Sequence, residues 1–388
     1  MYNVLTLNKI AACGTDLLDK GKYAVTDDTA VNADAILVRS ASMHEMELPA
    51  NLLAIARAGA GVNNIPIDKC SEKGVVVFNT PGANANAVKE LVIAGLLLSS
   101  RKIPAAMDWI KTLKGKGDEV GKLVEKGKSQ FVGPEIMGKK LGVIGLGAIG
   151  ILVANAAAEL GMDVYGADPY LSVENALKLS GKVHYVKSNK DIFEKCDYIT
   201  LHVPALPDTK GMINAEAIAS MKKTVRLLNF ARDTLVDEKA IINALANGGM
   251  ACYVTDFATD GLIGLDGVVA MPHLGASTPE SEDNCAVMAV KEISDYIENG
   301  NIKNSVNLPN VEMAITGNAK ICVIHKNSEG LLNNITAPVS AAGMNIENMV
   351  SKSKKDYAYT CLDVKGDTTG IEAALKAVAG VVAVRVIK

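Results

Sequence analysis

Three glycines follow an apolar run at a spacing that suits a phosphate-binding turn. Residues 141–150 read LGVIGLGAIG, so Gly145, Gly147 and Gly150 form a G-x-G-x-x-G pattern between a predicted strand and a predicted helix. The first glycine permits a tight turn, the second lets the backbone approach a pyrophosphate, and the third lets helix and strand pack closely. The free N–H groups of the helix would then face the phosphates. We interpret this segment as a dinucleotide-binding turn, with a glycine-rich packing turn as the alternative.

An acidic residue ends the next predicted strand. Asp168 follows the apolar run MDVYGA, where a dinucleotide-binding fold places a carboxylate on the ribose hydroxyls. The same carboxylate repels a 2′-phosphate, and the next residues, Pro169 and Tyr170, include no arginine. The sequence therefore favours NAD over NADP. A solvated turn carboxylate is the alternative for Asp168.

One of the five histidines lies where such a sheet binds its ligands. His273 occurs in the segment MPHLGAST, directly after a predicted strand, and ligands bind at strand ends in open parallel sheets. A nicotinamide enzyme that oxidises an alcohol needs a group that accepts the hydroxyl proton, and a neutral histidine suits this task. A structural histidine is the alternative.

The elements that position these residues are short apolar strands that alternate with helices. This pattern predicts parallel sheets covered by helices on both faces. Residues 319–388 instead predict the order β-α-β-β-α-β, which is ferredoxin-like. A linker is expected over residues 308–317 and an exposed, Lys- and Gly-rich connector over residues 111–131. In the cofactor region the predicted strands lie at residues 140–145, 162–168, 197–204, 225–231, 252–257 and 268–273.

Composition limits the class of protein. The chain has 388 residues, of which 49% are hydrophobic, so two or three domains with large cores are expected. The net charge of −3 does not suggest a nucleic-acid or membrane surface, and the apolar run at residues 91–98 is too short to span a bilayer. Seven scattered cysteines without a C-x-x-C motif favour neither disulfides nor a metal site. We expect a reduced, cytoplasmic protein without a secretory signal.

Several motifs together resemble the D-isomer-specific 2-hydroxyacid dehydrogenase family. They occur in the family's order across residues 39–278, and a set of matches is more specific than any single one. The region after residue 317 resembles an ACT domain. This combination, with the segment NTPGANANAVKELV, is most similar to the branch of the family that oxidises 3-phospho-D-glycerate with NAD in serine synthesis. The matching motifs are GVIGLGAIG, the Asp168–Pro169 pair, LHVP, NFARDTLVDE, VTDF and PHLGAST.

The resemblance implies a catalytic set of Arg232, Asp260 and His273, in which Arg232 holds the substrate carboxylate and Asp260 orients His273. Two departures occur: Asp233 stands where the family commonly has Gly, and Asp260 is shorter than the usual Glu. Asp256 resembles the family's acid near the nicotinamide carboxamide. The full set of implied cofactor residues is Gly145, Gly147, Ala148, Ile149, Gly150, Asp168, Val203, Pro204, Phe230, Ala231, Arg232, Asp256, His273, Gly275 and Ala276.

Substrate contacts are expected from the first domain. Arg39 matches an arginine that meets the substrate phosphate, and the implied substrate residues are Arg39, Gly61, Val62, Asn84, Arg232 and His273. A strand-end surface arginine is the alternative for Arg39. Two other functions remain open. The chain could be a dehydrogenase or reductase for another substrate of this class, such as glyoxylate, lactate or 2-hydroxyglutarate, or it could be a non-catalytic NAD-sensing protein.

The ACT-like region implies regulation. His325, Asn327 and Asn345 match the serine-binding residues of regulated family members, whereas Glu329 stands where Pro is common. A dimerisation domain without an effector is the alternative. A homodimer or homotetramer is expected, in which paired ferredoxin-like units cover their open sheet edges.

The expected fold class is α/β. It comprises a Rossmann-type, doubly wound cofactor domain at residues 100–278 and a flavodoxin-like substrate domain at residues 1–99 and 279–309. A ferredoxin-like α+β domain of ACT type follows at residues 317–388.

Overall fold

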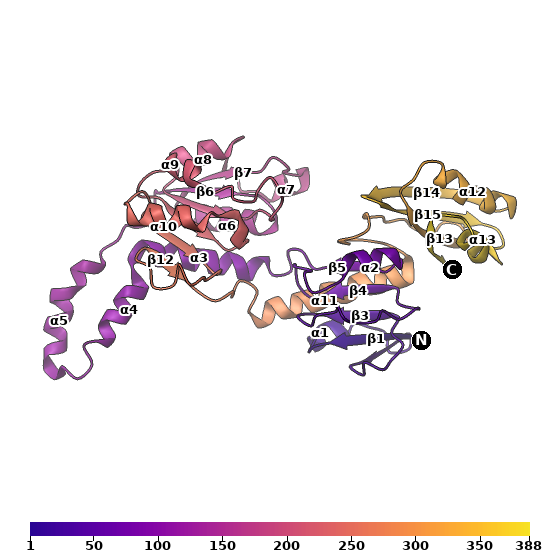
Figure 1. Ribbon diagram of the computed structural model, residues 1–388, viewed down its shortest axis with the longest axis horizontal. Helices are drawn as coiled ribbons and strands as arrows, with labels where there is room; N and C mark the ends of the chain where they lie inside the picture. The colour runs from indigo at the N-terminus through magenta and orange to yellow at the C-terminus, as the bar shows by residue number, and fades with distance from the viewer. The chain divides into compact units, whose positions relative to one another are not determined.

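The structure is a computed structural model that describes residues 1–388 as two units (Figure 1). Unit 1 comprises Met1–Asn84 and Pro279–Lys388, and unit 2 comprises Ala85–Thr278. The second crossing at Pro279 agrees with the sequence expectation, but the first lies before helix α3 (Ala85–Arg101) rather than at Ser99. The reason is packing, because Val88, Val92 and Leu96 of α3 are buried in the core of unit 2. Domain boundaries drawn from sequence therefore assigned this helix to the wrong side.

Unit 2 contains a parallel, seven-stranded sheet. Its order is β12-β11-β10-β9-β6-β7-β8, so the chain starts in the middle at β6, builds one side, and then returns to build the other. This is the doubly wound arrangement that the sequence predicted, and its strand order reverses between β6 and β9. The strands are β6 (Lys140–Ile144), β7 (Asp163–Ala167), β8 (His184–Tyr185), β9 (Tyr198–Leu201), β10 (Arg226–Asn229), β11 (Cys252–Thr255) and β12 (Val268–Ala270).

Helices cover this sheet, and several begin at polar side chains that accept backbone N–H bonds. Ser172, Ser188, Asn214 and Asp237 cap their helices in this way. The Lys-rich connector, expected to be largely exposed, forms a helical hairpin of α4 and α5. The helices are α4 (Ile103–Lys111), α5 (Val120–Gly127), α6 (Ala148–Glu159), α7 (Val173–Lys178), α8 (Asn189–Lys195), α9 (Ala215–Ala219) and α10 (Glu238–Ala246), with 3₁₀ turns at Gly117–Glu119, Lys128–Phe131 and Asp233–Leu235.

Unit 1 contains a parallel, five-stranded sheet in the order β2-β1-β3-β4-β5, which is the flavodoxin-like order. Helix α11 (Pro279–Asn299) packs on it after the chain returns from unit 2, and buries Ala289, Ile293 and Tyr296 in the same core as Phe78. The strands are β1 (Tyr2–Leu7), β2 (Tyr23–Thr26), β3 (Ala35–Val38), β4 (Ala54–Arg57) and β5 (Val76–Asn79), with short helices α1 (Ala12–Thr15) and α2 (Ile67–Glu72).

The C-terminal part has the predicted β-α-β-β-α-β order. Its antiparallel sheet runs β14-β15-β13-β16, with both helices contributing to one core. The elements are β13 (Ala319–Lys326), α12 (Leu331–Ala341), β14 (Asn345–Lys354), β15 (Tyr357–Lys365), α13 (Ile371–Lys376) and β16 (Val381–Ile387). None of the helices in the chain has the length and apolar character needed to cross a membrane.

A buried lysine and a half-buried arginine join this sheet to helix α11. Lys320 is fully buried and donates to the backbone oxygens of Asn299 (2.7 Å) and Met313 (2.7 Å) and to the side-chain oxygen of Asn301 (2.9 Å). Arg385 donates to the oxygens of Tyr296 (3.1 Å) and Ile297 (2.6 Å). The last carbonyls of a helix lack partners within it and attract positive charge, so β13 and β16 supply the C-terminal cap of α11.

The expected linker is also packed rather than loose. Leu308 and Val311 are 1% exposed, and Val311 pairs with Ile302 in an isolated antiparallel bridge. The C-terminal sheet therefore forms part of unit 1 through side chains as well as through the chain itself.

Candidate functional site

The predicted cofactor residues lie at one edge of the unit 2 sheet. All its strands are parallel, so their carboxyl ends meet at the same edge. This places side by side the residues that follow the individual strands. In chain order these are Gly145 after β6, Asp168 after β7, Val203 after β9, Ala231 after β10, Asp256 after β11 and His273 after β12.

The glycine turn has the geometry that the spacing predicted. Gly145 adopts φ +94°, which disfavours any side chain, and a Cβ there would lie 2.4 Å from the carbonyl oxygen of His202. A Cβ at Gly150 would lie 1.9 Å from the carbonyl oxygen of Gly145, so only glycine fits under α6. A Cβ at Gly147 would meet nothing within 4 Å. The first and third glycines are required by packing, whereas the second leaves open space at the start of α6.

Asp168 is held against this turn. Its Oδ2 accepts from the backbone N–H of Leu146 at 2.9 Å, and its Oδ1 accepts from that of Tyr170 at 2.8 Å. Each carboxylate oxygen can accept further bonds. The carboxylate is therefore fixed beside the glycine turn with acceptor capacity remaining for ribose hydroxyls.

The LHVP segment lines the reversal point of the sheet. Val203 is half-buried, and its Cγ1 lies near Gly145, whereas Pro204 is exposed. Burial lowers the pKa of His202 to about 3, so this ring is neutral, and its Nε2 lies 3.0 Å from the hydroxyl of Thr200. His202 is thus a structural histidine.

Asp256 is the most unusual polar group at this edge. Its residue is 3% exposed, and neither carboxylate oxygen has a hydrogen-bond partner that meets normal geometry. Burial raises the pKa of this carboxyl, while the charge of His273, the backbone N–H groups of Gly275 and Asp256, and the charge of Arg232 act in the opposite direction. A buried acid whose hydrogen bonding is incomplete is costly and points to a missing donor. A carboxamide N–H group of a nicotinamide fits that requirement.

His273 and Arg232 are both exposed at this edge. The His273 ring packs edge-on against Phe257, with ring centroids 4.9 Å apart. Arg232 has extended backbone geometry, and its guanidinium donates to the carbonyl oxygen of Ala231 at 2.6 Å. Asn229 donates to the Arg232 carbonyl at 2.8 Å and fixes that backbone. Arg232 and His273 are therefore close enough for the charge of each to lower the pKa of Asp256.

The remaining cofactor candidates frame this edge. Phe230 is buried at 6% exposed, and its ring lies next to Gly95 of α3. Gly275 is buried, and a Cβ there would lie 3.5 Å from Oδ2 of Asp256. Ala276 is half-buried, and Ala148 and Ile149 form the first turn of α6.

The two departures from the family pattern have different outcomes. Asp233 is not among the residues with positive φ; it begins a 3₁₀ turn, and its Oδ1 accepts from the N–H of Thr234 at 2.8 Å. The turn after Arg232 therefore accommodates an aspartate. Asp260 is exposed in the loop after β11. Asp256, by contrast, is buried, and the charge of His273 lowers the pKa of its carboxyl.

In unit 1 the substrate candidates lie at the carboxyl edge of the five-stranded sheet. Arg39 follows β3 and forms an ion pair with Glu282 at 2.5 Å. Gly61 and Val62 follow β4 and are half-buried, and Asn84 precedes α3. The parallel register brings the strand ends of β3 and β4 together.

Arg57 is a functional candidate that sequence reasoning missed. It ends β4, pairs in register with Val38, and donates from Nε to the carbonyl oxygen of Arg39 at 3.0 Å. A Cβ on Gly61 would lie 3.5 Å from its Nη1. The signal was available, because IARAGAG places an arginine at a strand end on the same edge as Arg39.

The three effector candidates differ in accessibility. His325 is 4% exposed, with Nδ1 2.7 Å from the Lys326 oxygen and Nε2 2.9 Å from the Thr360 hydroxyl. Burial lowers the pKa of this ring, so it is neutral within the sheet. Asn327 and Asn345 are exposed, and each donates locally, to the Lys355 oxygen and to Glu347. Both nitrogens of His325 thus have partners inside the C-terminal sheet.

Comparison with known proteins assigns the family. A family model described as "D-isomer specific 2-hydroxyacid dehydrogenase, NAD binding domain" matches residues 93–275. D-3-phosphoglycerate dehydrogenase of Haemophilus influenzae is 32% identical over 355 residues, which cover 88% of this chain and 83% of the relative. The chain belongs to the D-isomer-specific 2-hydroxyacid dehydrogenase family.

Other relatives agree with this membership. D-3-phosphoglycerate dehydrogenase of Methanocaldococcus jannaschii is 36% identical over 298 residues, covering 74% of this chain. The chain spans only 54% of the length of that relative and 59% of the one from Bacillus subtilis. The NAD⁺-bound 3-phosphoglycerate dehydrogenase of Entamoeba histolytica superposes with a TM-score of 0.61 at 28% identity, over 79% of this chain and 98% of that one.

The dehydrogenase family's NAD-binding domain thus corresponds to most of unit 2. Its matched range ends at residue 275 and includes the glycine turn, Asp168, Arg232, Asp256 and His273. The side chains present fit NAD, since Asp168 faces the glycine turn and Asp256 offers an unpaired acid. NAD is therefore the cofactor that this site suits.

Proposed function

We propose that the chain catalyses NAD-dependent oxidation of 3-phospho-D-glycerate to 3-phosphohydroxypyruvate, the first step of phosphorylated serine synthesis. The observation that carries the dehydrogenase proposal is the grouping of Arg232, Asp256 and His273 at the cofactor edge of unit 2. The choice of substrate is supported by relatives of 32–37% identity that are named D-3-phosphoglycerate dehydrogenase.

In this proposal each side chain has one task. Neutral His273 accepts the proton of the C2 hydroxyl, and its imidazolium returns that proton in the reverse direction. Arg232 holds the substrate carboxylate through two parallel N–H bonds. NAD, when bound, accepts the hydride from C2.

The acid that supports His273 is a separate question. We propose that Asp256 stabilises the positive charge that His273 gains, because it is buried and electrostatically linked to that ring. Asp260 is the residue that family resemblance favours, and it would have to approach His273 during turnover. The variants Asp256→Asn and Asp260→Asn distinguish these two acids. If Asp256 supports His273, Asp256→Asn changes the pH profile of kcat and Asp260→Asn leaves it unchanged; the opposite result would assign this role to Asp260.

We propose that Arg39 and Arg57 recognise the substrate phosphate. Two guanidinium groups at adjacent strand ends suit a doubly charged phosphate better than one, and the Gly61–Val62 backbone and Asn84 flank that edge. Arg39 already pairs with Glu282, and both side chains are about 40% exposed (42% and 43%). A phosphate would replace Glu282 as the partner of Arg39.

The decisive experiment is NADH oxidation with 3-phosphohydroxypyruvate, beside glyoxylate, pyruvate and 2-oxoglutarate. A strong preference in kcat/KM for the phosphorylated acid supports the proposal. Turnover of only an unphosphorylated acid would retain the roles of His273 and Arg232 and reject those of Arg39 and Arg57. NADH binding without any turnover would indicate an NAD-sensing protein instead.

Serine inhibition is proposed on narrower grounds. Asn327 and Asn345 are exposed and could reach a small amino acid, whereas His325 would have to give up its contact with Thr360. The measurement is turnover of 3-phosphohydroxypyruvate with and without millimolar L-serine. Unchanged activity would reject serine as an effector.

We also propose a homodimer in the cytoplasm. Helix α4 has no buried residue, and its apolar side chains Ile103, Met107 and Ile110 are 37%, 58% and 48% exposed. A second copy of this hairpin would cover them, and Met107→Glu would then shift the mass measured by light scattering towards the monomer. The cytoplasmic location is supported by seven free cysteines, six of them buried.

A further inference from the structure

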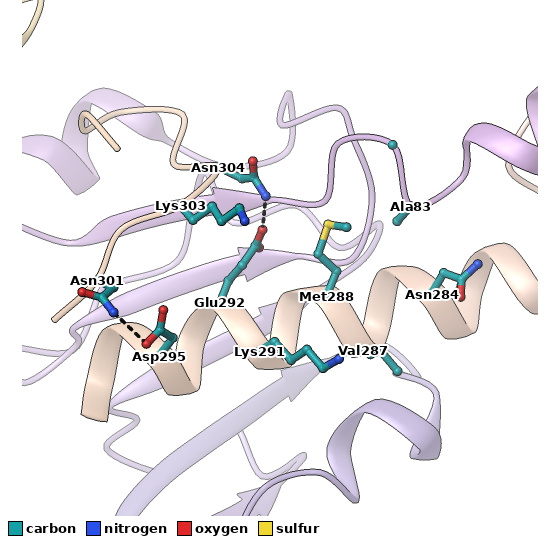
Figure 2. Close-up of a pocket in the computed structure, with 11 residues that line it drawn as sticks. Ala83, Asn284, Val287, Met288, Lys291, Glu292, Asp295, Asn301, Lys303 and Asn304 are labelled. Atoms are coloured by element: carbon teal, nitrogen blue, oxygen red, sulfur yellow. Dashed lines mark hydrogen bonds between the residues drawn. The ribbon is translucent and has the colours of Figure 1, made fainter. Parts of the chain in front are cut away.

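A pocket in unit 1, lined by both charged and apolar side chains, lies outside the catalytic residues. It has a volume of about 750 Å³, and one face of α11 forms its floor while the segment 301–304 and Gly82–Ala83 form its walls. The floor side chains recur at helical spacing, from Asn284 through Met288 and Glu292 to Asp295. Figure 2 shows Met288 and Glu292 extending from α11 towards Asn304 and Lys303. The size is typical of small-molecule sites.

Glu292 is the residue of this pocket whose hydrogen bonding is incomplete. The residue is 8% exposed; its Oε1 accepts from the side-chain amide of Asn304 at 2.7 Å, but its buried Oε2 has no partner (Figure 2). Asn304 holds this contact from a left-handed backbone conformation, φ +59°, which is uncommon outside glycine. Asn304 thus satisfies one of the two oxygens of a buried acid.

The second acid of the pocket is satisfied in a different way. Asp295 accepts from the side-chain amides of Asn299 at 2.8 Å and Asn301 at 3.1 Å. Two cations, Lys291 and Lys303, complete the charged lining, and Lys303 lies near enough to Glu292 to affect its titration. The pocket therefore offers one unpaired buried acid, two cations and an apolar centre at Met288 and Val287.

We propose that this pocket binds a small zwitterion of the α-amino acid class. Its ammonium group would donate to Oε2 of Glu292, its carboxylate would pair with Lys291 or Lys303, and its side chain would contact Met288 and Val287. Charges of both signs around an apolar centre select a ligand that carries both charges. An ordered water or a simple carboxylate ligand is the competing occupant.

Proton release distinguishes these occupants. Burial raises the pKa of Glu292 to about 8, with Lys303 and the Asn304 amide opposing that rise, so the empty pocket holds a mostly protonated acid at pH 7. An ammonium group requires the ionised form, so its binding releases about 0.9 proton at pH 7. A carboxylate ligand would accept from the acid that is already protonated, so its binding would release no proton.

The test uses the full chain. The L-amino acids are screened one at a time by thermal shift, and any that binds is titrated by calorimetry at pH 7 in two buffers of different ionisation enthalpy. We expect one or more to raise the melting temperature and to release protons. Glu292→Gln keeps an oxygen for the Asn304 amide; it should weaken binding at least tenfold and abolish the proton release. Met288→Trp, which fills the pocket, should weaken binding without altering Glu292.

The C-terminal domain provides the control. Binding that survives Glu292→Gln but disappears in Asn327→Ala belongs to that domain and would overturn the proposal. The proposal would also be overturned if no L-amino acid stabilised the wild type more than Glu292→Gln, or if binding occurred without proton release. Neither Glu292 nor Met288 contributes to the proposed catalysis, so turnover by both variants should equal that of the wild type.

Discussion

Glu292 makes the stability of unit 1 depend on pH in a direction that can be calculated. Its pKa rises from 4.5 to about 8 because burial penalises the charged form. The folded state therefore binds a proton more tightly than the unfolded state. Below pH 4.5 Glu292 is protonated in both states, so its burial costs no folding stability through ionisation. As pH rises from 4.5 to 8 the unfolded chain ionises first, and folding stability is lost; above pH 8 the loss is constant.

The magnitude follows from this shift. One pKa unit corresponds to about 1.4 kcal/mol, so the free energy of unfolding should fall by about 3.5 kcal/mol between pH 5 and pH 8 through this group alone. Glu292→Gln carries no titratable proton and should escape that loss. The variant should therefore gain about 3.5 kcal/mol on the wild type over the same range.

Urea denaturation at several pH values measures this difference. The only tryptophan, Trp109, lies in unit 2, so the unfolding of unit 1 is followed by near-UV circular dichroism of its buried tyrosines, including Tyr296 and Tyr359. The two units are fitted as separate transitions. Glu312→Gln, an exposed acid of the same unit, is the matched control and should show no such trend. A difference between Glu292→Gln and wild type that stays within about 1 kcal/mol from pH 5 to pH 8 would refute the burial argument.

Three further predictions test other parts of the molecule. Lys320→Met removes the three hydrogen bonds of a buried donor at the end of α11 and should lower the free energy of unfolding of unit 1 by about 3 kcal/mol in urea; a loss below about 1 kcal/mol would contradict the capping role. Gly150→Ala should weaken NADH binding at least tenfold and lower the melting temperature, whereas Gly147→Ala should weaken binding alone; equal melting losses would contradict the assigned roles. Arg57→Lys should raise KM for 3-phosphohydroxypyruvate at least tenfold with little change for glyoxylate, and an equal effect on both substrates would remove Arg57 from phosphate recognition.

Local sequence was sufficient where a constraint acts within a few residues. A glycine pattern between a strand and a helix fixed the turn at Gly145 and the start of α6, because positive φ and close packing exclude a Cβ. Alternating strands and helices gave both parallel sheets and the β-α-β-β-α-β order of the C-terminal part. Family resemblance then named the strand-end residues, and the parallel sheet placed them at one edge.

Other features depended on packing between distant segments. The sequence could not show that α3 buries Val92 and Leu96 in unit 2, because an apolar helix can pack on either of two adjacent cores. It also could not show that Asp256 is buried whereas Asp260 is exposed, because spacing along the chain does not determine burial.

By itself, the sequence determined the family, the order of the elements, the dinucleotide turn and the strand ends that carry the proposed chemistry. Only the tertiary structure placed Arg57 beside Arg39, buried Lys320 against the end of α11 and left one oxygen of Glu292 without a partner. The physical reason is that hydrogen-bond satisfaction and desolvation depend on every segment that surrounds a group. Those segments are separated by long stretches of chain, and folding alone brings them together.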